Sequence, residues 1–492
     1  MNSLDLTALL PQIILAYGAV ALLVIGAYWR NHAAIATLAL VVFVAAFAAI
    51  PFAVPLAPRQ ITPLLRVDAL SLFYTALFLL GGFALTVFAS DYLEDPSNGQ
   101  ERFYALLLFA VLGMLVLASS VHFASFFLGV QTLSVSLYGL IGFTLRRRAS
   151  LEASLKYVIL GGAALSFLLF GIALIYAEFG TMEFDALRAQ IGGAGLPALA
   201  RFGLGLIVVA FSFKLALAPF HTWAPDVYQG APVPVTALLA TGSKAGMFVL
   251  LLRFVSFLPL RQDESLFTLF VALSIATMFV GNLLALLQRN LKRMLACSSI
   301  AHMGYLLLPL LAGGTAGAAA LSFYFISYFL TTLAAFGVIA ALSREGEEVE
   351  DLDDYCGLAS RRPGLAAVLA LSMLSLAGLP LTVGFMAKFY LFAAAAQAGL
   401  WGLLIVGLVN SGIAAYYYLQ VLVALYLRPP RPETTWRQPR PASTAALAAL
   451  SLAVIFFGVY PGPLLASAQR MARQWLGQRS RSPATQVARG PR

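Results

Sequence analysis

Charged residues are scarce in this sequence, and their scarcity excludes most classes of soluble protein. Asp, Glu, Lys and Arg make up 11% of the 492 residues, whereas they make up about 25% of a soluble globular chain. Hydrophobic residues account for 61%, and the mean hydropathy is +0.88. The few charges lie between long apolar runs, so the composition indicates a polytopic membrane protein.

Residues that hold metals, disulfides or nucleotides are also few. Two cysteines, Cys297 and Cys356, cannot form a disulfide framework or a four-thiolate metal site. The four histidines form no HExxH motif, and neither a GxxxxGKS/T loop nor a GxGxxG turn occurs. The net charge of +10 would suggest nucleic acid for a soluble protein, but in a membrane protein it is typical of basic cytoplasmic loops. We therefore expect no metal, cofactor or nucleic acid on this chain.

Long apolar runs predict fourteen membrane-spanning helices. A spanning helix needs about 20 mostly apolar residues, and the alternating strand pattern of a membrane β-barrel is absent. The predicted spans are 9–29, 34–56, 67–90, 103–120, 122–143, 154–177, 202–224, 231–257, 265–287, 291–312, 316–342, 364–396, 400–427 and 443–466. The expected fold is an all-α polytopic membrane protein.

The basic residues predict the orientation of these spans. An even number of spans places both termini on one side. The loops on the opposite side carry fifteen Lys and Arg residues, and those on the side of the termini carry five. Because loops rich in Lys and Arg stay in the cytoplasm, we expect both termini on the outer side. Six arginines from Arg470 onward are an exception to this count.

Lysine occurs almost only inside the predicted spans, where a charge costs free energy. Four of the five lysines, Lys156, Lys214, Lys244 and Lys388, fall inside predicted spans, whereas the arginines lie almost entirely in loops. A lysine at mid-membrane costs roughly 2.5–3.5 kcal/mol, so these side chains should face the bundle interior, water or polar partners. Because a buried lysine can release its proton and arginine cannot, the pattern favours a proton relay over snorkelling side chains.

Carboxylates that could balance these lysines are missing from the interior of the spans. Asp68 and Glu178 lie at span edges, and Glu152 lies just before Lys156. The most polar residue of the fifth span is Gln131. Glutamine can hydrogen-bond an ammonium group or a water molecule, but it cannot hold a proton.

Two spans are interrupted by proline close to a lone lysine. Pro219 follows Lys214 in FKLALAPFH, and Pro380 precedes Lys388 in GLPLTVGFMAK. A proline inside a span frees backbone carbonyls, which is tolerated only where the site is buried or wet. The two segments are five spans apart, so the second is inverted relative to the first. Inverted repeats with discontinuous helices are typical of ion-coupled transport sites.

Three further polar residues are candidates for the same relay. His302 is the only histidine well inside a span, and Tyr305 lies one helical turn after it. For both, a relay role and simple hydrogen bonding between helices stay open. His221 lies near a membrane interface and is a secondary candidate.

Four segments resemble one known family. They are LEASLKYVILGGAALSFLLFGIALIY (151–176), FKLALAPFHTWAPDVYQGAPVP (213–234), NLKRMLACSSIAHMGYLL (290–307) and LSLAGLPLTVGFMAKFYLF (374–392). In this order they are similar to segments of the antiporter-like membrane subunits of bacterial proton-pumping NADH:quinone oxidoreductase, or respiratory complex I. The PDVYQGAP segment resembles the subunit N branch of that family rather than the sister subunits L and M.

The resemblance implies about fourteen helices with two inverted five-helix repeats and two discontinuous helices. It implies helices 1–3 over residues 1–102, a first repeat of helices 4–8 over 103–260, an inverted repeat of helices 9–13 over 261–428, helix 14 over 429–466 and a basic tail over 467–492. The family's key positions match Lys214, Lys244, His302, Lys388 and Lys156.

One departure from the family pattern concerns Gln131. The family has a glutamate in this span, and it pairs with the lysine of the first broken helix, here Lys214. An opposite charge within ~4–6 Å favours the protonated ammonium, so Lys214 should lose its proton more readily without one. Either a neutral link through Gln131 and water would suffice for the relay, or Glu152 or a neighbouring subunit would supply the missing negative charge.

The resemblance implies a membrane-arm subunit that translocates protons across a bacterial inner membrane, with both termini in the periplasm. NADH, FMN, iron–sulfur clusters and quinone would act in partner subunits, and this chain would contact neighbouring antiporter-like subunits, lipids and internal waters. Protons would enter near Lys244, pass His302 and leave near Lys388, with Lys214 as the switchable site. Two alternatives stay open: a stand-alone monovalent cation/proton antiporter, and a structural subunit whose relay is broken by Gln131.

Overall fold

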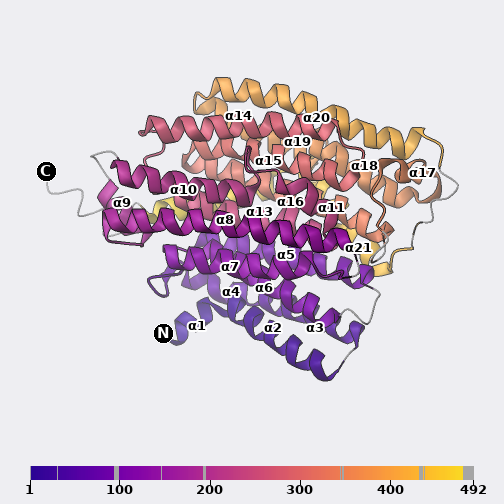
Figure 1. The fold of residues 1–492 in the computed structure, drawn as a ribbon, viewed down its shortest axis with the longest axis horizontal. Coiled ribbons are helices and arrows are strands. Elements are labelled where there is room, and N and C mark those ends of the chain that lie inside the picture. Colours follow the sequence, from indigo (N-terminus) through magenta and orange to yellow (C-terminus); the bar gives the residue numbers. More distant parts are fainter. Residues whose placement is uncertain are drawn as a thin grey trace.

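Long helices run side by side through most of the chain (Figure 1). The computed structural model describes residues 2–29, 31–93, 99–145, 147–191, 196–343, 345, 348–430, 436 and 438–479. Residues 480–492 of the predicted tail lie outside the described residues, as do five of the arginines counted for the orientation, namely Arg30, Arg146, Arg344, Arg431 and Arg437.

The helices and strands of the first half are α1 (Ser3–Ala8), α2 (Leu10–Tyr28), α3 (His32–Ala48), α4 (Ile50–Ala53), η1 (Val54–Leu56), β1 (Arg59–Gln60), β2 (Arg66–Val67), α5 (Ala69–Tyr92), α6 (Gln100–Ser119), α7 (Phe123–Ile141), α8 (Arg148–Phe179), α9 (Phe184–Ile191), α10 (Ala198–Leu215), α11 (Trp223–Gly230), α12 (Val233–Leu238), the π-helix η3 (Leu239–Ser243) and α13 (Lys244–Val255). The two short strands pair antiparallel, with Arg59 opposite Val67.

The second half contains α14 (Glu264–Leu286), α15 (Leu291–Ala312), α16 (Gly314–Leu342), η4 (Leu352–Tyr355), α17 (Leu358–Arg361), α18 (Pro363–Ala377), α19 (Val383–Gln397), α20 (Trp401–Leu427), α21 (Pro441–Val459) and α22 (Gly462–Arg479). Asparagine or aspartate side chains cap the first turns of several helices in both halves and satisfy free backbone N–H groups there. The capping residues include Asp68, Asp263 and Asn290.

The all-α polytopic membrane fold is confirmed. Thirteen helices of the described chain are long and apolar enough to cross a membrane. The shorter apolar helices α18 and α19 follow one another where the sequence predicts the twelfth span, so each of the fourteen predicted spans has a counterpart. The assignment of these helices to two inverted repeats stays a prediction.

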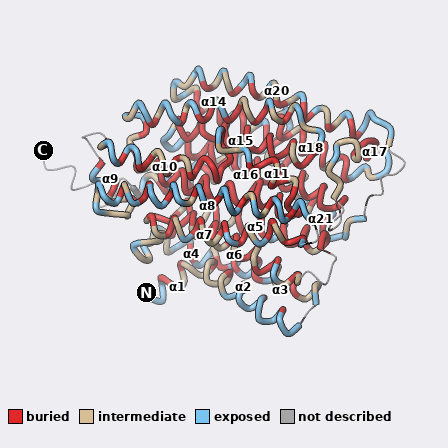
Figure 2. Tube along the Cα trace, viewed as in Figure 1, coloured by how far each residue is buried: buried red, intermediate tan, exposed pale blue. Residues whose placement is uncertain are grey.

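The middle of the bundle is formed by α13, α15 and α16, whose spans are almost entirely buried, and Figure 2 shows the region of α15 and α16 mostly in red. Val233–Val255 is buried along its whole length, and Leu291–Ala312 is buried except at Arg293 and Ala312. In α2, α8, α20 and α21, by contrast, a third or less of the most apolar window is buried. Small residues allow close packing near this centre. A Cβ on Gly281 of α14 would lie 2.4 Å from the backbone nitrogen of Ala301 in α15, so the two helices touch backbone to backbone.

Two features of the chain differ in detail from the predicted spans. The seventh predicted span, 202–224, is divided, since α10 ends at Leu215 and α11 begins at Trp223. Residues 467–479, which the sequence analysis places in the basic tail, belong to helix α22. Ala468, Met471 and Trp475 of α22 are buried, because this helix packs its apolar side against α16 and α5.

Arg253, an arginine in the fully buried span Val233–Val255, is satisfied by a buried ion pair. Its guanidinium group contacts the Asp68 carboxylate at 2.6 and 2.8 Å and donates to the carbonyl oxygen of Ala118 at 2.7 Å. Asp68 also caps the first turn of α5 through the N–H of Ser71. Arg253 therefore connects α13 with α6 and with the start of α5. Its hydrogen bonds within the described residues go to Asp68 and Ala118 and not to the groups around the span lysines.

Candidate proton-relay site

Lys214 lies in the last turn of α10, where the first broken helix ends. Ala216 takes a left-handed conformation with φ 56°, and the backbone N–H groups of Ala216 and Leu217 bond back to Phe213 and Ser212. Pro219 lies in the turn that follows. The helix therefore stops directly after the lysine, and the side chain projects into the bundle.

Aromatic rings and one hydroxyl surround the Lys214 ammonium. Its Nζ donates to the Ser134 hydroxyl at 2.7 Å. The centroids of the Tyr157, Phe213 and Tyr138 rings lie 4.9, 5.8 and 5.9 Å from Nζ. Distances below about 6 Å allow favourable cation–π interaction, so neutral groups surround this cation.

Gln131 lines a small cavity together with Lys214 and Met247. Its volume is about 10 Å³, close to the least that one water molecule needs. Within the described residues the Lys214 ammonium is hydrogen-bonded to Ser134 and not to Glu152, whose carboxylate is paired with Lys156 at 2.7 Å. The geometry is thus compatible with a link from Gln131 to Lys214 through a single water.

Lys156 belongs to a different environment from the other span lysines. Its side chain is 41% exposed and contacts Glu152 and Asp226, the latter at 2.9 Å. Asp226 also pairs with Arg293 at 2.7 Å. Burial would raise the pKa of Asp226, but its hydrogen bonds to Lys156 and Arg293 outweigh burial and hold the pKa below its usual range. The structure therefore places Lys156 in an ion network and not beside Lys214.

Lys244 begins α13, directly after the π-turn η3, in the fully buried centre of the bundle. Its Nζ donates to the Ser299 hydroxyl at 2.5 Å, and Tyr328 donates to the same hydroxyl at 2.7 Å. The Tyr228 ring lies 5.7 Å from Nζ. Like Lys214, this ammonium group is held by hydroxyl and aromatic groups.

His302 occupies the space between Lys244 and the second broken helix. Its Nδ1 bonds to the Tyr324 hydroxyl at 2.6 Å, and its Nε2 to the Tyr418 hydroxyl at 3.1 Å. Its ring lies 5.0 Å from that of Tyr328, centroid to centroid, and Tyr328 reaches Ser299. Contacts therefore lead continuously from Lys244 to His302.

Lys388 is held by the break between α18 and α19. Its Nζ donates to the carbonyl oxygen of Ala377, the last residue of α18, and to the Ser411 hydroxyl, both at 2.8 Å. The break depends on glycine, since Gly378 has φ 84° and a Cβ on it would lie 2.7 Å from Cδ of Lys388. Pro380 lies between the two helices. The proline-containing break therefore leaves the backbone carbonyl of Ala377 available to bind the lysine.

A second set of contacts joins His302 to Lys388. The ring of Tyr418 contacts that of Tyr417 at 4.4 Å, and Tyr417 donates to Asn282 at 2.9 Å. Asn282 approaches the Tyr305 hydroxyl at 3.5 Å, and the Tyr305 ring lies 5.5 Å from the Nζ of Lys388.

The structure thus brings Lys244, His302, Tyr305 and Lys388 into one polar row. Lys214 stands apart from it, because the hydrogen bonds of Lys214 within the described residues do not lead on to Lys244. His221, in the turn between α10 and α11, is partly buried and is not hydrogen-bonded to any of the four span lysines.

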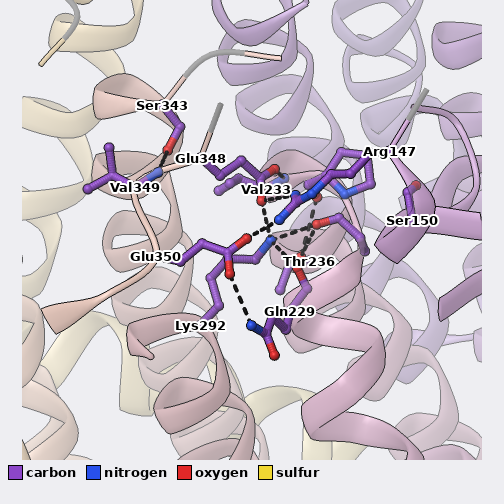
Figure 3. Close-up of polar contacts among 12 residues, drawn as sticks. Arg147, Ser150, Gln229, Val233, Thr236, Lys292, Ser343, Glu348, Val349 and Glu350 are labelled. Atoms are coloured by element: carbon purple, nitrogen blue, oxygen red, sulfur yellow. Dashed lines mark hydrogen bonds and ion pairs between the residues drawn. The ribbon is translucent and has the colours of Figure 1, made fainter. Parts of the chain in front are cut away.

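Sequence reasoning missed a buried charge cluster around Glu348 (Figure 3). Glu348 pairs with Lys292 at 2.6 Å and with Arg147 at 2.5 Å. Burial would raise the pKa of Glu348, but the charges of Lys292 and Arg147 outweigh burial and hold the pKa below its usual range. The available signal was the acidic run at 345–354, which resembles an ordinary solvated loop. In the part of the chain that the structure describes, no three His, Cys, Asp or Glu side chains form a group that could hold a metal ion.

Comparisons with known proteins agree with this architecture. Residues 120–414 match the family model described as NADH:quinone oxidoreductase/Mrp antiporter, TM. The chain is 45% identical over 474 residues to the NADH-quinone oxidoreductase subunit N of Methylococcus capsulatus, covering 95% of both chains.

Solved structures show the same fold. A chain of respiratory complex I from Thermus thermophilus, solved with bound aureothin, matches with a TM-score of 0.81 and 37% identity, covering 93% of this chain and 98% of that one. A chain of the Mrp complex from Dietzia sp. matches with a TM-score of 0.84 at 22% identity, covering 99% of this chain and 100% of that one, and shows the shared fold alone. On the family model and the close relative together, the chain belongs to the antiporter-like membrane subunits of respiratory complex I, in the subunit N branch.

Proposed function

We propose that this chain translocates protons across the bacterial inner membrane as a membrane-arm subunit of NADH:quinone oxidoreductase. NADH oxidation and quinone reduction, with flavin and iron–sulfur clusters, would take place in partner subunits. Neighbouring antiporter-like subunits, lipids and internal waters would contact this chain, and its termini would lie in the periplasm. Family membership supports the membrane-arm role, and the relay itself is inferred from the site.

One observation carries the proposal. Lys214, Lys244 and Lys388 are all buried. Within the described residues, the groups that bind their ammonium nitrogens are hydroxyls, a carbonyl and aromatic rings, without a carboxylate. A buried charge without a counter-ion is costly, and the cost disappears when lysine releases its proton. Such lysines are suited to alternate between charged and neutral forms, which is what a proton relay requires.

In this mechanism each proton would enter from the cytoplasmic side near Lys244. Ser299 and Tyr328 would pass it towards His302, whose two ring nitrogens can accept and donate in turn. Tyr418, Tyr417, Asn282 and Tyr305 would extend the polar row towards Lys388, from which the proton would leave, with internal waters completing the transfers. Lys214 would act as the switchable site that responds to the neighbouring subunit.

The proposal is tested by NADH-driven proton uptake per quinone reduced, in liposomes holding the whole complex. Lys214→Met and Lys214→Arg are compared with the wild type. Because neither side chain can release a proton in place of lysine, both variants should lose proton uptake. Wild-type stoichiometry in an assembled Lys214→Met complex would contradict the role given to this lysine, and rescue by Lys214→Arg alone would show that only its charge matters.

A structural subunit remains the second candidate, and Gln131 is the observation that favours it. The span that carries a glutamate in the family here contributes a neutral amide to the Lys214 cavity. If this subunit were only a scaffold, both Lys214 variants would pump normally once the complex is assembled. Exchange of protons for monovalent cations by the isolated chain would instead indicate an antiporter.

A further inference from the structure

Figure 3 shows the buried charge cluster at the loop 348–350, whose residues are not members of the polar row. Lys292 Nζ and Glu348 Oε2 are 2.6 Å apart, and neither side chain is exposed. Arg147 pairs with Glu348 at 2.5 Å and also with Glu350. Among these four described side chains, two cations balance two carboxylates.

The Lys292–Glu348 pair occupies the break between α11 and α12. Lys292 Nζ donates to the carbonyl oxygens of Gln229 at 2.9 Å and Ala231 at 2.7 Å, where α11 ends. Glu348 accepts from the backbone N–H of Val233 at 3.1 Å, where α12 begins. The last carbonyls and the first N–H groups of helices lack intrahelical partners and carry opposite partial charges. The cation thus lies at the negative end of one helix and the carboxylate at the positive end of the next.

The helix that begins at this break carries Lys244. α12 continues through the π-turn η3 into α13 as one span, Val233–Val255, and Lys244 follows η3 directly. Such π-turns are frequent at functional sites. On the other side of the break, Tyr228 of α11 places its ring 5.7 Å from the Nζ of Lys244. The relative position of the two helices therefore fixes how Tyr228 faces Lys244.

Glu350 belongs to the same cluster but does not hold the break. Its carboxylate is bonded to Arg147, to Gln229 at 3.2 Å and to Asn290 at 2.8 Å. It is hydrogen-bonded to neither Lys292 nor the N–H of Val233. Glu348 also accepts from the Tyr92 hydroxyl at 2.5 Å. The two glutamates thus share a location and differ in their contact with the break.

We propose that Lys292 and Glu348 are positioning residues of the proton relay. Together they hold the end of α11 against the start of α12, and so they fix Lys244 between Tyr228 and Ser299. Because the pair is neutral, it does so without adding a net charge near the ammonium group. The consequence for pumping rests on the proposed function, since it requires Lys244 to carry protons.

The test compares Glu348→Gln with Glu350→Gln in the whole complex reconstituted in liposomes. Both substitutions keep the size of the side chain and remove one negative charge from the cluster. A displacement of ~1 Å can cost a reacting group up to ~100-fold in rate. For a smaller displacement of Lys244 we expect the rate of NADH-driven proton uptake to fall about tenfold in Glu348→Gln and to stay within about twofold of wild type in Glu350→Gln. If Glu348→Gln does not assemble, Glu348→Asp replaces it with the same expectation.

Hydrogen exchange of the same complexes separates positioning from direct proton transfer. Peptides covering residues 231–243 should exchange faster in Glu348→Gln and not in Glu350→Gln, since only the first substitution weakens the break. Lys292→Arg, which keeps the cation, should retain most of the proton uptake. Normal uptake in Glu348→Gln, or reduced uptake with unchanged exchange, would overturn the positioning role.

A Lys244→Met complex serves as the independent check on the underlying function. If it pumps normally, the proposed function fails at Lys244, while the exchange data still report whether Glu348 holds the break. If it loses pumping and Glu348→Gln does not, the relay stands and the positioning role is wrong.

Discussion

The two broken helices place a lysine in two different environments. Lys214 lies at the end of α10, where Ser134 and the rings of Tyr138, Tyr157 and Phe213 surround its ammonium group. Lys388 lies within α19 and binds the carbonyl oxygen of Ala377, at the C-terminal end of α18. The helix α10 thus ends just after its lysine, whereas the second break turns the free carbonyl end of α18 towards Lys388.

The difference shows that similar sequence features can stabilise a buried cation by different means. The carbonyl end of a helix carries a partial negative charge and favours a cation there. The face of an aromatic ring attracts a cation through its quadrupole. Lys388 therefore has a directed hydrogen bond to the backbone, whereas Lys214 depends on side chains that substitution can remove.

Replacing the second lysine should have the largest effect. In Lys388→Met the relay loses its last titratable group, and the rate of NADH-driven proton uptake should fall about 100-fold, the usual scale for loss of a proton-transfer group. Lys388→Arg should fail almost as fully, because arginine does not release its proton. Quinone reduction by the assembled complex is the control measurement, and uptake near wild type in either variant would remove Lys388 from the relay.

Removing an aromatic ring from the first site should have a smaller effect. Tyr157→Leu takes away the ring nearest to Lys214, and a cation–π contact is worth ~0.5–2 kcal/mol, so the rate of proton uptake should change about 2- to 30-fold. Tyr157→Phe keeps the ring face and should stay close to wild type. Equal effects of the two substitutions would indicate that the hydroxyl group or packing matters instead. The same pair of substitutions at Tyr305 would show whether the Lys388 site depends less on its ring.

Gln131→Glu would change the first site by supplying the carboxylate that the sequence resemblance implies at this position. The side chain of residue 131 lines the same cavity as Lys214, and a carboxylate within ~4–6 Å favours the protonated ammonium by one to three pH units. The optimum of proton pumping should therefore move to higher pH by about one unit. An unchanged profile, measured from pH 6 to about 9, would show that the missing charge comes from elsewhere.

The smallest effect is expected at the site of Lys156, the span lysine that does have carboxylate partners, when its partner Asp226 is replaced. The hydrogen bonds of Asp226 to Lys156 and Arg293 lower the pKa of its carboxyl group. The stabilising contribution of Asp226 is therefore present above the ordinary aspartate pKa of about 3.9, and it is lost as the pH falls through the lower folded-state value. Asp226 is 37% exposed, so Asp226→Asn should cost only ~0–1 kcal/mol at pH 7. Thermal unfolding of the wild-type and Asp226→Asn complexes at pH 7 and near pH 4 measures this difference in stability. A loss of stability in the variant that occurs only at low pH would contradict the prediction.

Much of the candidate site could be predicted from the sequence, because lysine, histidine and proline inside apolar runs are conspicuous. Lys214, Lys244, Lys388 and His302 are all buried in the structure, as their cost in a membrane requires. Lys156 was predicted on the same ground, yet it is partly exposed, since burial depends on which side of α8 faces its neighbours.

The partners of these residues could not be predicted. Tyr418 and Asn282 join the polar row from helices far away in sequence, and Glu348 comes from an acidic run that resembles a solvated loop. The sequence by itself determined where the chain crosses the membrane, because apolar length is a local property that the bilayer selects directly. Only the tertiary structure decided which group holds each charge, because those contacts join residues such as Lys244 and Ser299 that are brought together by helix packing alone.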